Sequence, residues 1–405
     1  MLLSQYFPPE VGATQTRVDV FASHLESAGH DVTVIAEVPN HPTGVVFDGW
    51  QKRFAQRSRE KGYGVVRVWV AASPKKSFWR RIAFYATYAI NAVLAALFVV
   101  RRRPDVVIAT SPPLPVALAG MTVATICRRP FVADIRDIWP AVGVALGELQ
   151  PGRAMRAAQH LERLVYRRAA AVTTVTNTFV EHIVELGTPR ERVHLIPNGT
   201  LPELFNPDRV DPTLRDRLGL NSGFVIGYVG LHGIAQGLGA LIDAARELGK
   251  DGVQLLMVGE GPVKADLQRQ ANDIGAANVV FVDQVPLEEV TPYINACDVM
   301  VVPLRRLEIL EGFIPSKLFD FMACAKPVIL MVDGEARAIL EAAHGGVYVE
   351  AENADGLADA VRRLASEPET AKAMGERGRE FVLQHYVRSR QAEQLEEIVR
   401  QVAST

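Results

Sequence analysis

The sequence predicts an α/β fold made of two Rossmann-like domains with parallel sheets. Short apolar stretches typical of buried strands alternate with helical stretches along the chain, and this alternation predicts βαβ units. At 405 residues the chain is long enough for two domains that each bury a core. A connection rich in Pro and Asn begins at residue 197 and ends near residue 212, and it is the best candidate for a domain boundary.

We therefore expect a first domain over residues 1–200, a linker over 201–212, a second domain over 213–386 and an amphipathic helix over 387–405 that packs back towards the first domain. The expected strands lie at residues 1–4, 32–36, 65–70, 105–110, 131–133, 171–175 and 193–196, and then at 224–230, 253–258, 279–282, 299–302 and 328–332.

Composition is typical of a globular protein in a reducing, cytosolic setting. The first 200 residues contain 24 Lys and Arg against 15 Asp and Glu, so this half is the one expected to meet anionic lipid or phosphate. Cys127, Cys297 and Cys324 lie far apart and suggest neither a disulfide framework nor a zinc site. The N-terminus shows no signal-peptide pattern.

The first strand is followed by a loop in which Gly12 could approach a ligand closely, although an ordinary turn glycine is an equal alternative. Neither half contains GxGxxG, which argues against a nicotinamide dehydrogenase. Residues 37–64 form a long polar connection, which we interpret as an acceptor-binding loop. The lone His41 in this connection is expected to be neither acid nor base.

Residues 82–100 are almost uninterrupted apolar and have basic residues on both sides. Three interpretations compete: a transmembrane helix, a buried helix on a sheet, and a helix partly sunk in the membrane surface. Because strands are expected on both sides, a span would split one sheet across the bilayer. We favour a membrane-facing helix at about 78–103 that covers the sheet and touches anionic lipid with its outer side.

Charged residues gather after the strand at 131–133, in the run FVADIRDIWP. Asp134, Arg136, Asp137 and Trp139 lie where open α/β sheets bind ligands, at the carboxyl end of a strand. This position favours a site, while the alternative is a salt bridge from Arg136 that fixes the loop.

In the second half, a glycine loop with Gly233 and Gly237 follows a strand and leaves backbone amides free for phosphate. The next strand ends in Gly259 and Glu260, so polar groups and glycines gather at one edge of the expected sheet.

Residues 308–329 form a loop, a helix and a strand, with Pro315 and Ser316 at the helix start. Lys317 adds a positive charge there, and Asp320 lies on the same side of the first turn. A diphosphate at the helix start with a ribose hydroxyl on Asp320 would suit this layout. The alternative is that these residues only cap and solubilise the helix.

The order of these motifs resembles glycosyltransferase family 4, the retaining sugar-nucleotide enzymes of the GT-B fold with two facing Rossmann-like domains. The resemblance covers nearly the whole chain and rests on SQYFPPEVGATQTR, GHDVTVIA, FVADIRDIWP, IPNG, GYVGLHGIAQGL, LLMVGEGP and IPSKLFDFMACAKPVI. It is most similar to the bacterial subgroup of amino-sugar or fucosamine transferases that builds lipid-linked surface polysaccharides.

The resemblance implies a role for each matching residue, and three of these roles are catalytic: Lys317 stabilises the donor diphosphate, Glu311 lies near the transferred sugar and Asp137 faces the acceptor. The others that the resemblance implies bind substrates, namely Gly12, Gly233, Gln236, Gly237, Val285, Ser316 and Asp320. Among these, Ser316 joins Lys317 on the diphosphate, Asp320 holds the ribose and Val285 meets the base through its backbone. Arg136, Gly259 and Glu260 are further substrate-binding candidates because of their places at the ends of strands.

Two departures from the family pattern concern the donor site. Asp320 replaces the usual glutamate and reaches about one methylene less, and Glu311 is one residue out of register. Gln236 stands where many members carry lysine, so Lys317 and the helix start are expected to bear more of the phosphate charge.

We therefore expect a retaining glycosyltransferase that moves a sugar, an N-acetylated amino sugar by resemblance, from UDP to a polyprenyl-diphosphate-linked acceptor at the inner-membrane surface. No cofactor or metal is expected, because fixed charges can stabilise the leaving group. The alternatives are a UDP-sugar epimerase on the same fold and a non-catalytic, membrane-associated sugar-nucleotide-binding protein. No nucleic-acid partner is expected.

Overall fold

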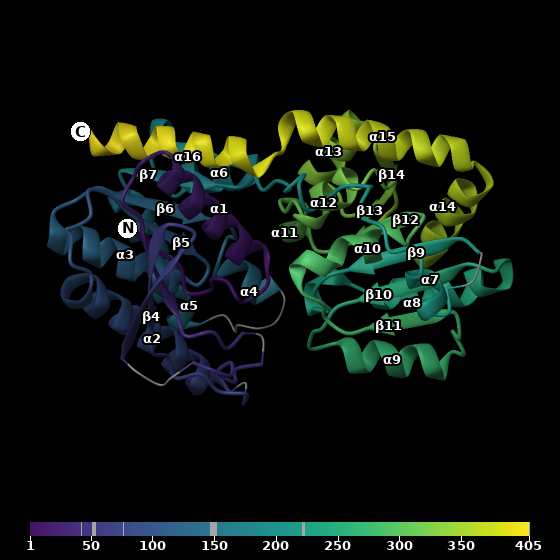
Figure 1. Cartoon of the computed structure of the whole chain (residues 1–405), viewed down its shortest axis with the longest axis horizontal. Coiled ribbons are helices and arrows are strands. Elements are labelled where there is room, and N and C mark those ends of the chain that lie inside the picture. The colour runs from purple at the N-terminus through teal and green to yellow at the C-terminus, as the bar shows by residue number, and fades with distance from the viewer. Residues whose placement is uncertain (42, 51–53, 76, 146–151, 221–222, 405) are drawn as a thin grey trace. The chain divides into compact units, whose positions relative to one another are not determined.

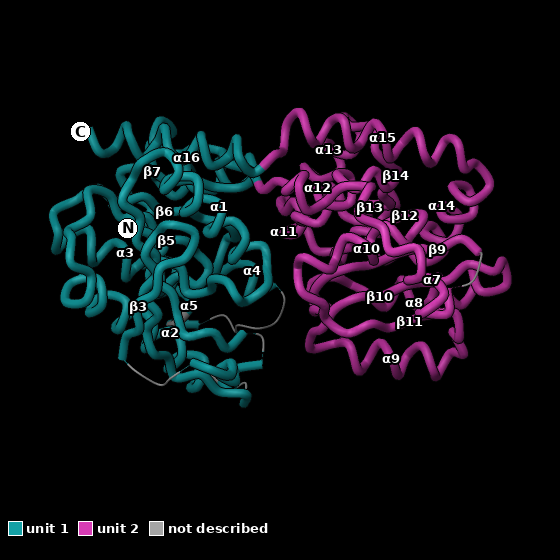
Figure 2. Tube along the Cα trace, in the orientation of Figure 1, with its two compact units in different colours: residues 1–197, 388–405 teal, residues 198–387 magenta. Residues whose placement is uncertain are grey.

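The structure, a computed structural model, describes residues 1–41, 43–50, 54–75, 77–145, 152–220 and 223–404 (Figure 1). The chain divides into two compact units (Figure 2). Unit 1 comprises Met1–Pro197 and Arg388–Thr405, and unit 2 comprises Asn198–Val387. Residues 201–212, which the sequence suggests as a linker, are counted in unit 2.

Unit 1 is built on an eight-stranded sheet in the order β3-β4-β2-β1-β5-β6-β7-β8. The neighbours are parallel except β3 and β4. Its strands are β1 (Leu2–Leu3), β2 (Thr33–Glu37), β3 (Ala55–Glu60), β4 (Tyr63–Val68), β5 (Val107–Ser111), β6 (Phe131–Ile135), β7 (Ala171–Thr174) and β8 (Val193–Leu195). Its helices are α1 (Ala13–Ser27), α2 (Phe78–Leu94), α3 (Leu114–Cys127), α4 (Ala141–Ala145), α5 (Arg153–Arg168), α6 (Asn177–Glu185) and α16 (Arg388–Ala403).

Side chains alternate between the two faces of this sheet, so each face has its own core. Ile35 packs on the face covered by α2 and α3, whereas Val34 packs on the face covered by α1 and α16. The C-terminal helix α16 lies along α1 and buries Leu395 and Ile398 in that second core (Figure 1). The expected return of the last helix to the first domain is therefore observed within unit 1.

The expectation that residues 37–64 form an irregular connection is wrong for its second half. Residues 55–60 form β3, which pairs antiparallel with β4 from Ala55 opposite Val68 to Glu60 opposite Tyr63. The sequence AQRSRE has no apolar run, so the strand signal is absent. Charged residues are usual on an edge strand, where they discourage pairing with another chain.

The apolar stretch around residues 82–100 forms α2 and a π-helical turn, Ala95–Val99. Trp79–Val99 is long and apolar enough to cross a membrane by length and composition alone. However, α2 packs on α3, and Tyr88 is buried and donates a hydrogen bond of 2.8 Å to the carbonyl of Ile35. The strands before and after the helix, β4 and β5, belong to the same sheet. The helix therefore covers one face of the sheet of unit 1.

Unit 2 is built on a six-stranded parallel sheet in the order β11-β10-β9-β12-β13-β14. Its strands are β9 (Val225–Val229), β10 (Gln254–Val258), β11 (Val279–Val282), β12 (Val299–Pro303), β13 (Val328–Met331) and β14 (Gly346–Tyr348). Its helices are α7 (Leu214–Arg217), α8 (Gly239–Leu248), α9 (Lys264–Asp273), α10 (Val290–Asn295), α11 (Glu308–Glu311), α12 (Lys317–Ala323), α13 (Glu335–Ala343), α14 (Ala354–Ser366) and α15 (Pro368–His385).

All strands of unit 2 end at one edge because they are parallel. The loops after β9, β10, β11 and β12 leave the sheet there, as the positions of glycines and polar residues in the sequence suggest. In open α/β sheets this edge is the usual ligand site.

Candidate functional site

Three glycines let the loops after β9 and β10 touch each other and Lys317. A Cβ atom on Gly230 would lie 2.6 Å from Lys317 Nζ, and one on Gly259 would lie 2.0 Å from the carbonyl oxygen of Gly230. A Cβ atom on Gly261 would lie 2.2 Å from the carbonyl oxygen of His232. Gly230 and Gly259 also have φ near +140°, which favours glycine. A side chain at any of the three positions would disrupt the loops.

Lys317, the first residue of α12, turns its ammonium group back towards β9. Its Nζ atom donates a hydrogen bond of 2.8 Å to Tyr228 Oη and lies 3.9 Å from the centre of the tyrosine ring. Tyr228 Oη in turn donates to the carbonyl of Leu231 at 2.6 Å. Burial lowers the pKa of Lys317 to about 7, and the negative charge of Asp320 opposes this shift. An anion bound beside Lys317 would favour its charged form.

The loop after β9, in which Gly230 borders this lysine, carries several backbone N–H groups. The N–H of Gly230 donates to Val258 and that of His232 to Glu260, but those of Leu231 and Gly233 donate to no group in the part of the chain that the structure describes. A lysine beside unpaired N–H groups is an arrangement that binds phosphate.

Among the other predicted residues of the loop after β9, Gly237 has the left-handed φ of +60° that a glycine favours. The Oε1 atom of Gln236 is buried and accepts no hydrogen bond from the described residues. Gly233 faces the same amide group, since a Cβ atom there would lie 2.5 Å from Gln236 Oε1.

The predicted residues around the start of α12 differ in burial and in hydrogen bonding. Ser316 precedes the helix and makes no side-chain capping bond to it, and Asp320 is half-buried on its first turn. Glu311 is exposed at the end of α11 and makes no hydrogen bond to another described residue of the site. The structure thus groups Lys317 and Asp320 but does not tie Glu311 to them.

Two further predicted residues lie at the ends of β10 and β11. Glu260 forms an ion pair of 2.6 Å with Lys264, which also pairs with Asp283 at 2.5 Å. The Glu260 carboxylate is therefore already engaged in an ion pair, in which it shares Lys264 with Asp283. Val285 is half-buried in the loop after β11, where its backbone could meet a base.

The predicted residues of unit 1 cluster after β6. Asp134 is buried and paired with Arg17 at 3.0 Å, and Thr173 donates to it at 2.8 Å. Arg136 donates to Thr110 Oγ1 at 2.8 Å, and also to Thr14 and to the carbonyl of Pro112. These bonds hold the loops together, so Arg136 fits the alternative of a residue that fixes the loop. Its hydrogen-bond partners among the described residues are hydroxyl and carbonyl groups and not the acid of the expected salt bridge.

Asp137 differs from its neighbours because no described residue donates a hydrogen bond to its carboxyl group. Burial raises its pKa to about 6, although the positive charge of Arg136 opposes the shift. A carboxyl group with a pKa near 6 can accept a proton at neutral pH. Gly12, the remaining predicted residue of this unit, precedes α1 and has an extended backbone.

Sequence reasoning missed two groups. Glu10, which is 3% exposed, accepts backbone N–H bonds of 2.8 Å from Asn40 and His41 and so holds the first loop to the next one. His232, which is fully buried, lies between the loops after β9 and β10. Neither has a local sequence signal, because both depend on contacts between separate loops.

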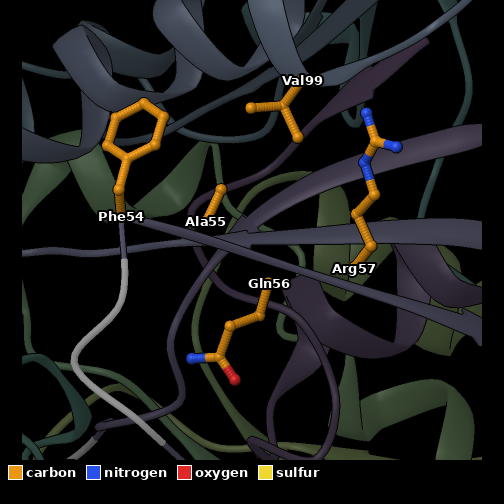
Figure 3. Close-up of a pocket in the computed structure, with 5 residues that line it drawn as sticks. All are labelled: Phe54, Ala55, Gln56, Arg57 and Val99. Carbon is orange, nitrogen blue, oxygen red and sulfur yellow. The ribbon is translucent and has the colours of Figure 1, made fainter.

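One open recess of about 550 Å³ lies elsewhere in unit 1, between β3 and the π-helical turn (Figure 3). It is lined by Phe54, Ala55, Gln56, Arg57 and Val99, none of which belongs to the predicted site. Among the described residues, no group of three or more His, Cys, Asp or Glu side chains is placed to hold a metal ion.

Comparison with protein families identifies both halves of the chain. Residues 12–199 match the family described as "Glycosyl transferase 4-like domain", and residues 223–367 match "Glycosyl transferases group 1". The chain thus contains two successive glycosyltransferase domains, and its fold is that of the GT-B glycosyltransferases. The match to two successive domains agrees with the resemblance seen in the sequence motifs.

Alignments with individual relatives cover most of this chain. It is 25% identical over 399 residues to an Escherichia coli K12 protein named as the colanic acid biosynthesis glycosyl transferase WcaI, covering 94% of this chain and 97% of the relative. It is 28% identical to a GDP-mannose-dependent phosphatidylinositol monomannoside mannosyltransferase of Mycolicibacterium smegmatis, covering 68% and 79%. The crystal structure of Anabaena HepE in complex with UDP-glucose has a TM-score of 0.73 at 17% identity and covers 99% and 98%.

Proposed function

We propose that this glycosyltransferase takes a sugar from a UDP-sugar donor that binds at the carboxyl edge of unit 2. The proposal rests on Lys317 and on the N–H groups of Leu231 and Gly233, which donate to no described residue; we call these three the anion-binding group. The UDP-glucose in the complex of HepE, a protein of the same fold, supports uridine as the base. GDP remains the second candidate, since the mycobacterial relative is named for GDP-mannose.

In the proposed reaction Lys317 and the loop N–H groups stabilise the negative charge that develops on the UDP leaving group. Each such fixed group is worth about 2.7–4 kcal/mol of barrier in well-studied enzymes. Asp320 holds the ribose and the Val285 backbone meets the base. We propose that the transfer retains the anomeric configuration and needs neither metal nor cofactor. Activity that is unchanged by a chelator would support this, and its loss on chelation with recovery on adding Mg²⁺ would refute it.

The donor site is tested by thermal unfolding of the protein with UDP, GDP and ADP. A ligand at a hundred times its dissociation constant stabilises a fold by about 2.7 kcal/mol. We expect stabilisation by UDP that is lost in Lys317→Met and kept in Lys372→Met, a control at an exposed lysine of the same unit. If no nucleotide stabilises the wild type, the donor proposal is wrong. Stabilisation by GDP alone would show that the donor is a GDP-sugar and not a UDP-sugar.

We propose that the transferred sugar is an N-acetylated amino sugar and that the acceptor is a polyprenyl-diphosphate-linked glycan of a bacterial surface polysaccharide. The colanic acid relative supports a role in surface polysaccharide synthesis, and the basic first half of the sequence favours an anionic acceptor. The amino sugar rests on the resemblance in sequence motifs alone. Asp137, with a carboxyl group free of hydrogen-bond donors among the described residues, would assist the acceptor hydroxyl. Release of UDP from UDP-N-acetylhexosamines only in the presence of such a lipid acceptor would establish both substrates.

A lipid-linked acceptor requires that the protein reach the cytoplasmic face of the inner membrane, and we propose that the outer side of α2 makes this contact. Ile90 and Leu94 of α2 and Phe98 of the π-helical turn that continues it follow one another at intervals of four residues and are exposed by 59%, 37% and 79%. Trp79 at the other end is exposed by 75%. Exposed arginines follow at residues 101–103. An apolar stripe beside basic residues is typical of a helix that lies in an anionic membrane surface.

Vesicle sedimentation tests the membrane contact separately from donor binding. We expect the protein to bind vesicles with anionic lipid and to bind purely zwitterionic vesicles weakly. The double variant Ile90→Gln and Phe98→Gln should lose this binding, whereas Val210→Gln, at a similarly exposed apolar residue of unit 2, should keep it. Equal binding by both variants would contradict the assignment of α2.

A further inference from the structure

His232 is a fully buried polar residue whose backbone is fixed on both sides. Its N–H donates to the carbonyl of Glu260 at 2.8 Å, and its own carbonyl accepts from Val263 at 3.1 Å. Its ring lies beside Tyr228, with ring centres 5.7 Å apart. Neither ring nitrogen has a hydrogen-bond partner among the described residues. The imidazole is therefore held in one place with its polar atoms unused.

Burying polar atoms without partners costs free energy, and such atoms call for an explanation. Burial and the positive charges of Lys264 and Lys317 lower the pKa of His232 to about 4. The ring is thus neutral at ordinary pH and offers one N–H donor and one acceptor. A neutral donor can bond to an anion without adding a second positive charge beside Lys317.

The ring is adjacent to the anion-binding group of unit 2. A Cβ atom added to Gly259 would lie 3.5 Å from His232 Nε2 and 2.0 Å from the carbonyl oxygen of Gly230, so the ring and Gly230 both border Gly259. Gly230 in turn borders Lys317 Nζ. The residues on either side of His232 in the chain, Leu231 and Gly233, carry the two N–H groups that donate to no described residue. One short segment thus presents three neutral donors beside one lysine.

We propose that His232 is a further donor-binding residue, whose ring N–H bonds to a phosphate oxygen of the nucleotide and completes a set of neutral donors around Lys317. The inference rests on the proposed donor site. Gln236 is uncharged and cannot attract a phosphate as a lysine would. The inference assigns part of the phosphate binding to His232 instead. Gly261 lets the loop after β10 approach the His232 backbone, and Gly259 lies beside the ring, so these glycines allow the close packing that holds His232.

The test compares the binding of UDP, uridine and inorganic pyrophosphate to the wild type, His232→Phe, His232→Gln and Lys317→Met. Phenylalanine keeps a ring without nitrogen, whereas glutamine restores an N–H group at similar reach. A hydrogen bond to a charged group corresponds to an affinity change of about tenfold to a hundredfold. We expect His232→Phe to weaken UDP and pyrophosphate binding by that factor and to leave uridine binding unchanged. His232→Gln should recover part of the loss.

A second measurement needs no variant that could unfold. In wild-type protein with ¹⁵N-labelled histidine, one ring signal should shift when UDP or pyrophosphate is added and not when uridine is added. The melting temperature without nucleotide shows whether each variant is folded. If wild-type protein binds UDP but His232→Phe binds it equally well, or no ring signal shifts, His232 is a packing residue and only this inference fails. If the wild type binds neither UDP nor pyrophosphate, the donor proposal fails with it.

Discussion

At the residue scale, Lys317 links donor binding to proton uptake. Its pKa in the free protein is about 7, and the negative charge of a bound diphosphate would raise it. At pH 8 the free protein therefore holds this lysine mostly neutral, and the complex holds it protonated. We expect the uptake of roughly one proton on binding UDP at pH 8, and an affinity that falls as pH rises above 7.

Calorimetry of UDP binding in buffers of different ionisation enthalpy measures this uptake. The nucleotide phosphates are already ionised at pH 8, so they contribute little. Lys317→Met should bind UDP weakly and without proton uptake. Uptake that persists in this variant would show that another group titrates.

Asp137 is the second residue whose ionisation has a measurable consequence. Its pKa of about 6 lies above the value of about 3.9 for an unfolded chain, so the folded state binds more protons between these values. Stability is therefore lost as pH rises from about 4 to 6, and the loss persists at higher pH. We expect Asp137→Asn to raise the stability of unit 1 by about 1 kcal/mol at pH 7.5, since the side chain is only partly buried.

The comparison uses urea unfolding at pH 7.5 and at pH 4.5, where the gain should shrink. Asp105→Asn, at an 85% exposed side chain of the same unit, is the matched control and should change little. If Asp137 assists the acceptor, the stabilised variant should also transfer sugar more slowly. A variant that is stabilised and fully active would leave Asp137 without a role in the reaction.

At the element scale, α16 is held to α1 by charge as well as by apolar packing. Glu396 on α16 accepts bonds from His24 Nε2 at 2.9 Å, from His30 Nε2 at 3.0 Å and from Arg400 Nη2 at 2.6 Å. These donors lower the pKa of Glu396 to about 2. A carboxylate with a lowered pKa stabilises the fold above its unfolded value of about 4.3, and this contribution is lost as pH falls towards 2.

We therefore expect Glu396→Gln to lower the thermal stability of unit 1 at pH 6 and to have little effect near pH 2.5. Glu393→Gln on the exposed side of the same helix controls for helix propensity and should be neutral. Because surface charge networks contribute about 1 kcal/mol or less, the difference is best measured at low ionic strength. Equal melting temperatures of Glu396→Gln and Glu393→Gln at pH 6 would contradict a stabilising role of the Glu396 carboxylate.

Secondary elements were predictable from the sequence wherever their signal is local. The strands at 225–229 and 254–258 are apolar runs between glycines, and α16 has a clear amphipathic pattern. The edge strand β3 was missed because its polar sequence forms a strand only by pairing with β4. The site followed the same rule: Lys317 and the glycine loop were found, but the burial of His232 depends on Gly259 and Gly261, which approach from another loop.

At the scale of the whole molecule, unit 1 is completed by the last helix of the chain. Removal of residues 388–405 would expose the core that Leu395 and Ile398 cover, and burying such side chains is worth about 1.5–3 kcal/mol each. We expect this truncation to lower the melting temperature of unit 1. The stability of unit 2 and its stabilisation by UDP should stay nearly unchanged.

Hydrogen exchange resolves the two units separately. A control truncation that removes only residues 404–405, beyond the end of α16, should leave both units protected. Equal loss of protection in both units would show that they unfold together. A unit 1 that stays protected would show that α16 is dispensable for its core.

The return of α16 also sets an order for biosynthesis. Unit 1 consists of two segments, Met1–Pro197 and Arg388–Thr405, whereas unit 2 is one continuous segment between them. On the ribosome, unit 2 can therefore reach its complete fold before unit 1 does. Until α16 has been synthesised, the nascent unit 1 keeps the apolar surface along α1 uncovered, so a premature stop after unit 2 would release a chain prone to aggregation.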